Sequence, residues 1–269
     1  MAAYVWHFLA AFFALFIFAA PVAADEVVLK GAGEKVTLIA GNTLSAEPVL
    51  IGLRMKMKPG WHTYWRAPGD SGIAPTFDWS ASKNVTTLEL LWPVPERFDA
   101  EGDITFGYAG EVIWPVLVRV TDPAKPLVLH LNMSYGVCNN ICVPNAVRLA
   151  LTVFPTASEQ AIIGNAEGGA IRASLLRVPV APEPPVKVTA KLNGEELQVV
   201  LAGVSGTPVF IPEVTRGFWF GPPQVSRSGA DVTYKMPVEI GKGQKLKDTT
   251  VTMVFAGPET AIEAKVKVE

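Results

Sequence analysis

The stretch Tyr135-Gly-Val-Cys138-Asn-Asn-Ile-Cys142-Val-Pro144 holds both cysteines of the 269-residue chain. Before it, residues 127–137 alternate strictly between apolar side chains and polar or small ones, which predicts a half-buried β-strand. Residues 146–153 continue the same alternation on the other side of the cysteines. The pattern places Cys138 and Cys142 on the polar face of the two predicted strands.

A hairpin turn between the cysteines explains this spacing best. In one continuous strand, Cα atoms four positions apart would be about 13 Å apart, whereas a disulfide needs about 4.4–6.8 Å. Asn139 and Asn140 tolerate the left-handed conformation of short hairpin loops. One helical turn is the alternative, but Pro144 and the β-rich flanks argue against it. The sequence therefore predicts a hairpin that permits a Cys138–Cys142 disulfide.

Three roles are open to this cysteine pair. As a structural staple, a bridge across so small a loop adds only about 2 kcal/mol in the chain-entropy model. As a zinc site, two thiolates lack the further histidine or cysteine ligands of a tetrahedral shell. A pair on a polar face near a loop suits thiol–disulfide exchange, and we favour that role.

Three segments carry a resemblance to a known family: the cysteine stretch, Pro59-Gly-Trp-His-Thr-Tyr-Trp-Arg-Ala-Pro-Gly-Asp-Ser-Gly72, and Phe106-Gly-Tyr-Ala-Gly-Glu-Val-Ile-Trp-Pro115. Together they resemble the periplasmic N-terminal domain of the thiol:disulfide interchange protein DsbD, and more closely that of the ScsB-type proteins. The resemblance implies an immunoglobulin-like domain whose cysteines pass electrons from a membrane-embedded reductase to periplasmic thioredoxin-like proteins. By position, Cys142 matches the cysteine that forms the mixed disulfide and Cys138 the one that resolves it. The C-x3-C spacing is shorter than in DsbD itself.

The resemblance also implies a cap loop with an aromatic ring over the disulfide. Residues 97–108 lie in the corresponding part of this chain, and they offer Phe98, Phe106 and Tyr108 as cap candidates. Tyr135, which opens the cysteine stretch, is a fourth candidate for contact with the cap or with a partner.

An aromatic block at residues 61–65 has two interpretations. Aromatic rings are favoured in sheets and fill sandwich cores, so we favour a core strand. The alternative is a wall beside the cysteine pair. His62 within the block has no evident partner that would make it a general base or a copper ligand.

The chain divides into four predicted parts. Residues 1–24 form a secretory signal peptide with an apolar run and small residues before a cleavage site, although an uncleaved membrane anchor is the alternative. Residues 25–155 are the β-sandwich with the cysteine pair. Residues 156–185 hold a helix, expected over 158–177 from a capping box, and a Pro-rich linker. Residues 186–269 form a second, smaller β domain. We expect the electron donor to be a separate membrane protein, because no multi-span region follows.

The overall expectation is an all-β, immunoglobulin-like periplasmic protein acting as a thiol–disulfide oxidoreductase through Cys138 and Cys142. Its clients would be thioredoxin-like proteins, such as a disulfide isomerase or a cytochrome c maturation factor, and no cofactor is indicated. A formal net charge of −2 and a pI of about 6.0 argue against nucleic acid as a partner. The alternatives are a non-catalytic binding module with a structural disulfide, and a copper-handling protein that uses both cysteines, with or without Met133.

Overall fold

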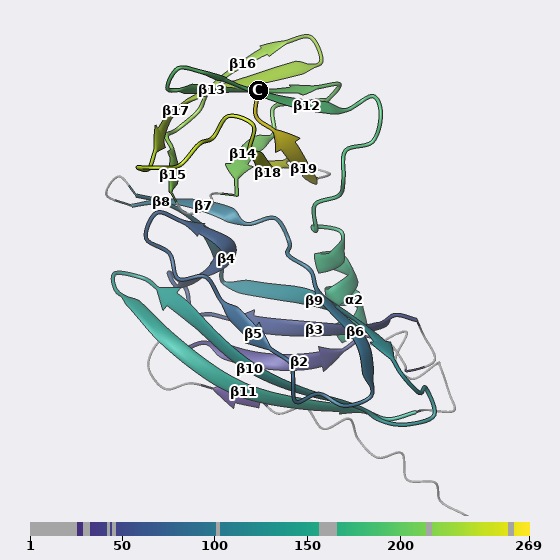
Figure 1. The fold of residues 1–269 in the computed structure, drawn as a ribbon. Coiled ribbons are helices and arrows are strands. Elements are labelled where there is room, and N and C mark those ends of the chain that lie inside the picture. Colours follow the sequence, from purple (N-terminus) through teal and green to yellow (C-terminus); the bar gives the residue numbers. More distant parts are fainter. Residues whose placement is uncertain are drawn as a thin grey trace, which may run out of the picture.

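The computed structural model describes residues 26–28, 33–41, 44, 47–100, 103–155, 166–213, 217–257 and 261–269. These residues form a larger β unit, one short helix and a smaller β unit, which confirms the predicted all-β class (Figure 1). The expected signal peptide lies outside the described residues. In the part that is described, no helix combines the length and apolar character needed to cross a membrane.

One sheet of the larger unit has the strand order β1-β2-β3-β9-β6. All of its neighbouring strands are antiparallel. They are rich in valine, leucine and isoleucine, side chains that pack well on a pleated surface. The strands are β1 (Glu26–Val28), β2 (Lys35–Ala40), β3 (Val49–Lys56), β9 (Glu111–Val120) and β6 (Val85–Leu90).

The opposite sheet has the order β11-β10-β4-β8-β7, with the short strand β5 also paired to β10. Its longest pair is the predicted hairpin, whose register is unbroken from Leu127↔Val153 to Cys138↔Cys142. Within this sheet β10 is an interior strand, whereas β11 lies at the edge. The strands are β11 (Cys142–Val153), β10 (Leu127–Cys138), β4 (His62–Gly69), β8 (Asp103–Ala109), β7 (Glu96–Ala100) and β5 (Thr76–Asp78).

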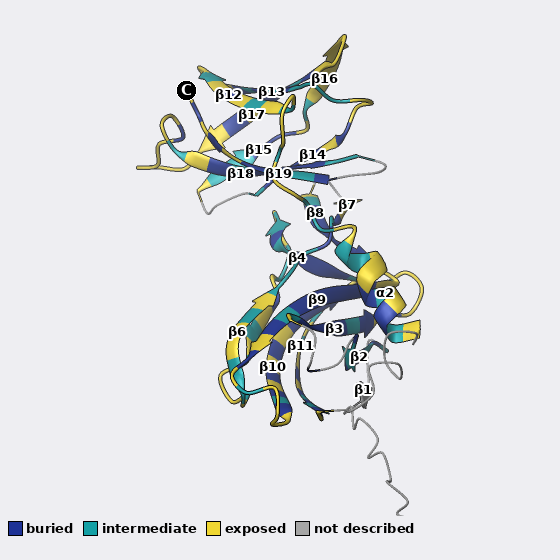
Figure 2. Ribbon diagram, turned by 90° about the vertical axis from the view of Figure 1, so that its right-hand side faces the viewer, coloured by how far each residue is buried: buried dark blue, intermediate teal, exposed yellow. Residues whose placement is uncertain are grey.

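The main core fills the space between these two sheets, so the unit is a β-sandwich. Trp65 of β4 and Trp114 of β9 come from opposite sheets, and both are fully buried in one apolar cluster. The predicted alternation holds along β10, where every second residue from Leu127 to Val137 is buried. Figure 2 shows this buried face along β9 and β10.

The helix α2 (Ala166–Leu175) covers the outer face of the first sheet (Figures 1 and 2). Ile171 is fully buried. A Cβ atom at Gly41 or Gly52 would come within 3.0 Å of its side chain, so these glycines make room for the helix. Within the described residues the helix ends at Leu175, just before the predicted end at residue 177. Residues 156–165, which include the capping box, lie outside the described residues, so that part of the prediction is not tested.

The smaller unit has a separate apolar core, between a five-stranded and a three-stranded sheet. The first has the order β12-β13-β17-β15 with β16 paired to β17, and the second has the order β14-β18-β19. Its strands are β12 (Lys187–Asn193), β13 (Glu196–Ala202), β14 (Val209–Pro212), β15 (Phe218–Phe220), β16 (Gln224–Ser228), β17 (Asp231–Ile240), β18 (Thr250–Ala256) and β19 (Ala261–Lys267).

Candidate functional site

The β10–β11 hairpin brings the two cysteines together, as the sequence predicted. Cys138 and Cys142 are register partners, they form a disulfide, and their Cα atoms are 4.1 Å apart. The loop between them closes with a hydrogen bond from the Asn139 N–H to the Ile141 carbonyl oxygen, at 3.1 Å. The expected left-handed asparagine is wrong: among the described non-glycine residues, positive φ occurs at Asn84 and Asp248, not in this loop.

The two cysteines differ sharply in exposure. Cys142 begins the edge strand and is exposed, and Ile141 beside it is 68% exposed. Cys138 ends the interior strand, pairs with His62 of β4 and is only 1% exposed. Both cysteines lie on the predicted polar face of the hairpin, but this face is covered at Cys138 by Tyr64 of β4. A Cβ at Gly136, on the same face, would come within 2.8 Å of the Ile73 side chain.

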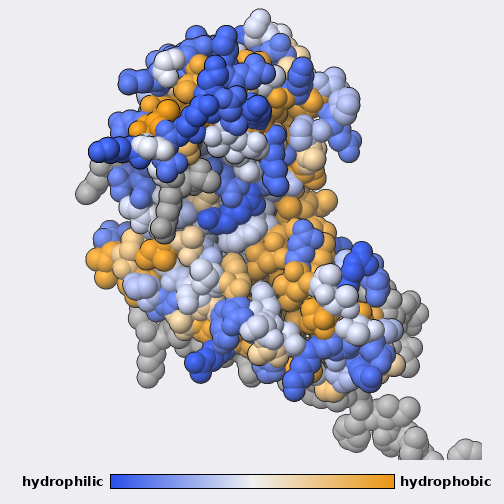
Figure 3. Space-filling model, in the orientation of Figure 1, coloured by the Kyte–Doolittle hydropathy of each residue, from blue (hydrophilic) through white to orange (hydrophobic). Residues whose placement is uncertain are grey.

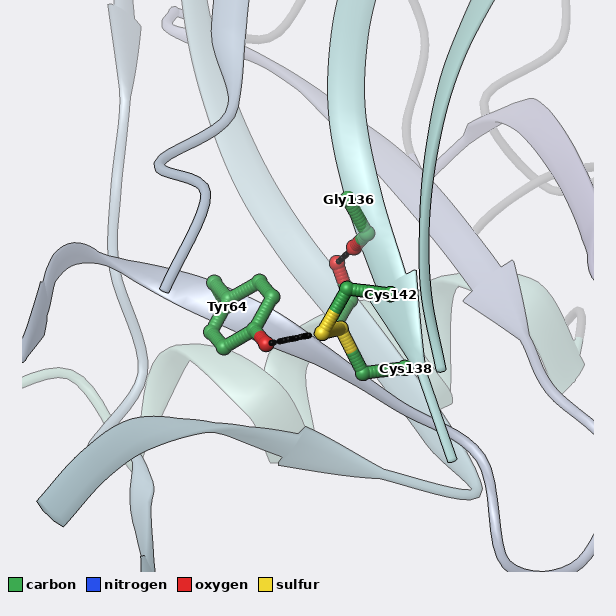
Figure 4. The surroundings of a disulfide bond; sticks show 5 residues. Tyr64, Gly136, Cys138 and Cys142 are labelled. Atoms are coloured by element: carbon green, nitrogen blue, oxygen red, sulfur yellow. Dashed lines mark hydrogen bonds between the residues drawn. A yellow bond between two sulfur atoms is a disulfide. The ribbon is translucent and has the colours of Figure 1, made fainter. Parts of the chain in front are cut away.

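Tyr64 of β4 contacts both sulfur atoms (Figure 4). Its hydroxyl oxygen is 2.7 Å from Cys138 Sγ and 3.2 Å from Cys142 Sγ. Sulfur atoms in a disulfide carry no proton, so the phenol is the donor. Tyr64 is 2% exposed, and burial raises its pKa above the ordinary value. The hydroxyl therefore keeps its proton at neutral pH. Of the two sulfur atoms, the one closer to it belongs to the buried Cys138.

His62 and Phe98 extend this aromatic arrangement towards the surface. The His62 and Phe98 rings are stacked, with centroids 4.4 Å apart and planes 18° apart. The His62 ring also meets the edge of Tyr64, with centroids 5.4 Å apart. Burial lowers the pKa of His62, so the imidazole is neutral at neutral pH. The half-buried His62 thus links the Phe98 ring to Tyr64, and Tyr64 contacts the disulfide directly.

Comparison with known proteins identifies the sandwich. Residues 35–153 match the family model described as thiol:disulfide interchange protein DsbD, N-terminal. This part of the chain is a DsbD N-terminal domain. Among solved structures, the fold is similar to the N-terminal periplasmic domain of ScsB from Proteus mirabilis, with a TM-score of 0.73 and 21% identity over 92% of this chain and 99% of that chain. None of the curated proteins searched matches the chain.

Of the cap candidates in this DsbD N-terminal domain, Phe98 stacks on His62, which is the register partner of Cys138. Phe106 is 5% exposed and packs in the main core. Tyr108 is 4% exposed, and its hydroxyl donates a hydrogen bond to the Pro93 carbonyl oxygen at 2.8 Å. Both rings are therefore buried in the main core.

Tyr135 lies on the other side of β10 from the disulfide. It is 1% exposed, and its hydroxyl donates a hydrogen bond to Glu34 Oε1 at 3.1 Å. Asn145, its register partner on β11, donates to the same oxygen at 2.9 Å. Tyr135 thus helps to hold the two arms of the DsbD hairpin together from within the core.

Sequence reasoning treated the aromatic block at residues 61–65 as one unit, whereas strand alternation divides it. Trp65 is fully buried in the core of the DsbD N-terminal domain, and Tyr64 faces the sulfur atoms. Both interpretations of the block are therefore partly right. The signal that could have singled out Tyr64 was period-two alternation, which places it on the same face as His62.

The copper hypothesis used both cysteines, with or without Met133 as a further sulfur ligand. Met133 is 1% exposed and belongs to the main core, on the opposite face of β10 from Cys138. In the described part of the chain, no cluster of three or more histidine, cysteine, aspartate or glutamate side chains is arranged to hold a metal ion. Among the described residues of this DsbD N-terminal domain, Met133 therefore does not join the two cysteines in a sulfur site.

Proposed function

We propose that this protein is a periplasmic thiol:disulfide interchange protein that passes electrons through Cys138 and Cys142. A membrane-embedded thiol reductase would reduce the pair, and the pair would then reduce thioredoxin-like proteins. The observation that carries the proposal is the asymmetry of the disulfide: an exposed cysteine is bonded to a buried cysteine whose sulfur accepts a hydrogen bond from Tyr64. The similar domain of ScsB is periplasmic, which supports residues 1–24 as an export signal.

The asymmetry assigns the two sulfur atoms different roles in exchange. A thiolate of the donor attacks Cys142 Sγ, forms a mixed disulfide with it and breaks its bond to Cys138. Cys138 leaves as a thiolate, which the Tyr64 hydroxyl stabilises by hydrogen bonding before the sulfur takes up a proton. A second donor thiolate then attacks the donor's own sulfur and releases Cys142. The donor is left oxidised and the pair is left as a dithiol.

Delivery of electrons to a client reverses these steps. The Cys142 thiolate attacks the client disulfide and forms a mixed disulfide, while one client sulfur leaves as a thiolate. The Cys138 thiolate then attacks Cys142 Sγ, which restores the intramolecular disulfide and releases the reduced client. The chemistry needs two cysteines and no cofactor.

Phe98 serves in this proposal as the cap that shields the exposed sulfur. Its ring is held on His62 by stacking, a contact worth about 0.5–1.5 kcal/mol. So weak a hold lets a docking partner displace the ring at little cost. The cap would then limit reaction of Cys142 with small thiols without blocking a protein partner.

The alternative role as a structural staple has less support. The two arms of the hairpin are joined by an unbroken antiparallel register up to the cysteines themselves. Glu34 also holds both arms, through Tyr135 and Asn145. Because the bond joins residues that are already held together, it adds little to the stability of the fold.

A trapping experiment tests the proposal. Reduced Cys138→Ser and Cys142→Ser variants are mixed with an oxidised periplasmic thioredoxin-fold disulfide isomerase, and covalent complexes are separated on non-reducing gels. Cys138→Ser should form a stable mixed disulfide, because its exposed Cys142 attacks the client and no second sulfur resolves the complex. Cys142→Ser should form little complex. Equal trapping by both variants, or trapping by Cys142→Ser alone, would contradict the assigned roles.

A further inference from the structure

The strand that carries Tyr64 loses its regular pairing directly after this residue. The register of β4 with β8 runs from His62↔Ala109 to Tyr64↔Gly107, then shifts and resumes at Gly69↔Thr105. The register of β4 with β10 is confined to His62 and Thr63. Residues 65–68 therefore form an irregular segment that the sheet does not hold in register, immediately beside the residue that contacts the disulfide.

Arg66, in the middle of this segment, reaches the smaller β unit. Its Nε and Nη2 atoms donate hydrogen bonds to the two carboxylate oxygens of Glu213, each at 3.3 Å, and Nη2 also donates to Glu263. The guanidinium carbon lies 4.5 Å from the centre of the Trp65 ring. The three charged side chains are 22% to 29% exposed, so solvent screens them only partly.

The two carboxylates belong to a sheet that is firmly attached to the sandwich. Glu213 directly follows β14, and Glu263 lies on β19, at opposite edges of the three-stranded sheet. Ile211 and Val254 from this sheet are almost completely buried, in the same apolar cluster as Trp65. Figure 3 shows hydrophilic as well as hydrophobic surface where the two units meet. Arg66 is thus anchored to a fixed support.

We propose that Arg66 is a positioning residue for the redox site, and that the smaller β unit supports β4 through it. By tying the irregular segment to Glu213 and Glu263, Arg66 keeps the Tyr64 hydroxyl against the sulfur atoms while the disulfide opens and closes. This gives the smaller unit a role in the chemistry, although it contributes no residue to the site. The inference rests on the proposed exchange function.

The first test is the Arg66→Met variant, which keeps most of the stem of the side chain and removes its hydrogen bonds. We expect reduction of the disulfide by dithiothreitol to slow by no more than the roughly three- to tenfold that loss of a hydrogen bond to the leaving thiolate would cause. A Glu213→Gln/Glu263→Gln variant should show the same direction of change, and it covers the case in which Arg66→Met does not fold. Arg66→Lys should recover part of the rate, since lysine restores the charge without the paired geometry.

Arg119→Met is the matched control. It breaks an exposed ion pair with Glu47, at 3.2 Å, in the larger unit. We expect this variant to be reduced at the rate of the unmodified protein. Urea unfolding midpoints of all variants separate a loss of stability from a change at the site, and the pH dependence of alkylation of the reduced protein reports on the thiols directly.

A double-mutant cycle decides whether Arg66 acts through Tyr64. If it does, Arg66→Met should cause no further slowing in a Tyr64→Phe background. Rates for Arg66→Met equal to those of the unmodified protein, or fully additive effects of the two substitutions, would overturn the inference. Failure of the proposed function gives a different result, because Cys138→Ser would then trap no client in the mixed-disulfide experiment.

Discussion

The hydroxyl of Tyr64 should lower the barrier for opening the disulfide, and Tyr64→Phe removes it while keeping the ring. At 2.7 Å from Cys138 Sγ, the hydroxyl donates to the sulfur that becomes the leaving thiolate. A hydrogen bond to a charged group contributes about 1.5–3 kcal/mol. Brønsted coefficients of about 0.4–0.5 for thiol–disulfide exchange mean that removing the hydroxyl raises the activation barrier by roughly half of this energy. The expected result is a reduction about three- to tenfold slower.

The same substitution should shift the equilibrium between disulfide and dithiol. It raises the pKa of the reduced Cys138 thiol, because the thiolate loses its donor. Above that pKa, losing about 1.5–3 kcal/mol of thiolate stabilisation makes the reduction potential about 30–60 mV more negative. Removing the hydroxyl therefore makes the pair harder to reduce and slower to react.

Stopped-flow reduction by dithiothreitol measures the rate, and thiol trapping in defined redox buffers measures the potential. Tyr234→Phe is the matched control, since its buried hydroxyl donates to the Pro208 carbonyl oxygen at 2.7 Å, in the smaller unit. That variant should keep the rate and the potential of the unmodified protein. An unchanged rate and an unchanged potential in Tyr64→Phe would refute the role assigned to this hydroxyl.

Three further predictions follow from the site and its support. Phe98→Ala should speed alkylation of the reduced protein at Cys142 by iodoacetamide about two- to tenfold, because the stack on His62 is worth about 0.5–1.5 kcal/mol; slower alkylation would argue against a cap. Burial lowers the pKa of His62, so the folded state binds fewer protons than the unfolded state below about pH 6.5, and stability is lost as the pH falls through that range. The unfolding free energy from urea titrations should therefore drop less between pH 7.5 and 5.5 in His62→Gln, and an equal drop would contradict the burial effect. Gly107→Ala should destabilise the fold by about 1–3 kcal/mol or more in thermal unfolding, because its Cβ would lie 1.9 Å from the Thr63 carbonyl oxygen; an unchanged midpoint would show that β4 and β8 can separate freely.

The hairpin and its register were predictable because the information is local. Strict alternation on both sides of the cysteines and a three-residue gap are enough to place Cys138 opposite Cys142. The apolar strands of the first sheet were predictable for the same reason. The β7–β8 hairpin was not among the predicted strands, because residues 97–108 contain several charged residues and glycines that resemble a loop.

Long-range pairing sets the features that the sequence did not reveal. Tyr64 meets Cys138 from 74 positions away in the chain, and Arg66 meets Glu263 from 197 positions away. The burial of Cys138 also depends on β4 lying beside β10, which no local pattern specifies. The aromatic block at residues 61–65 was recognisable in the sequence. Which of its rings enter the core and which face the cysteines depends on the order of strands in the sheet.

The central claim is that the Cys138–Cys142 bond is made and broken in use, and the reduction potential of the purified protein tests it most directly. Equilibration with glutathione or dithiothreitol buffers, followed by thiol trapping, gives the fraction of open disulfide at each potential. We predict a value above about −300 mV, within the range of proteins that exchange disulfides. A value well below about −300 mV, which is typical of structural disulfides, would contradict the relay and favour the staple.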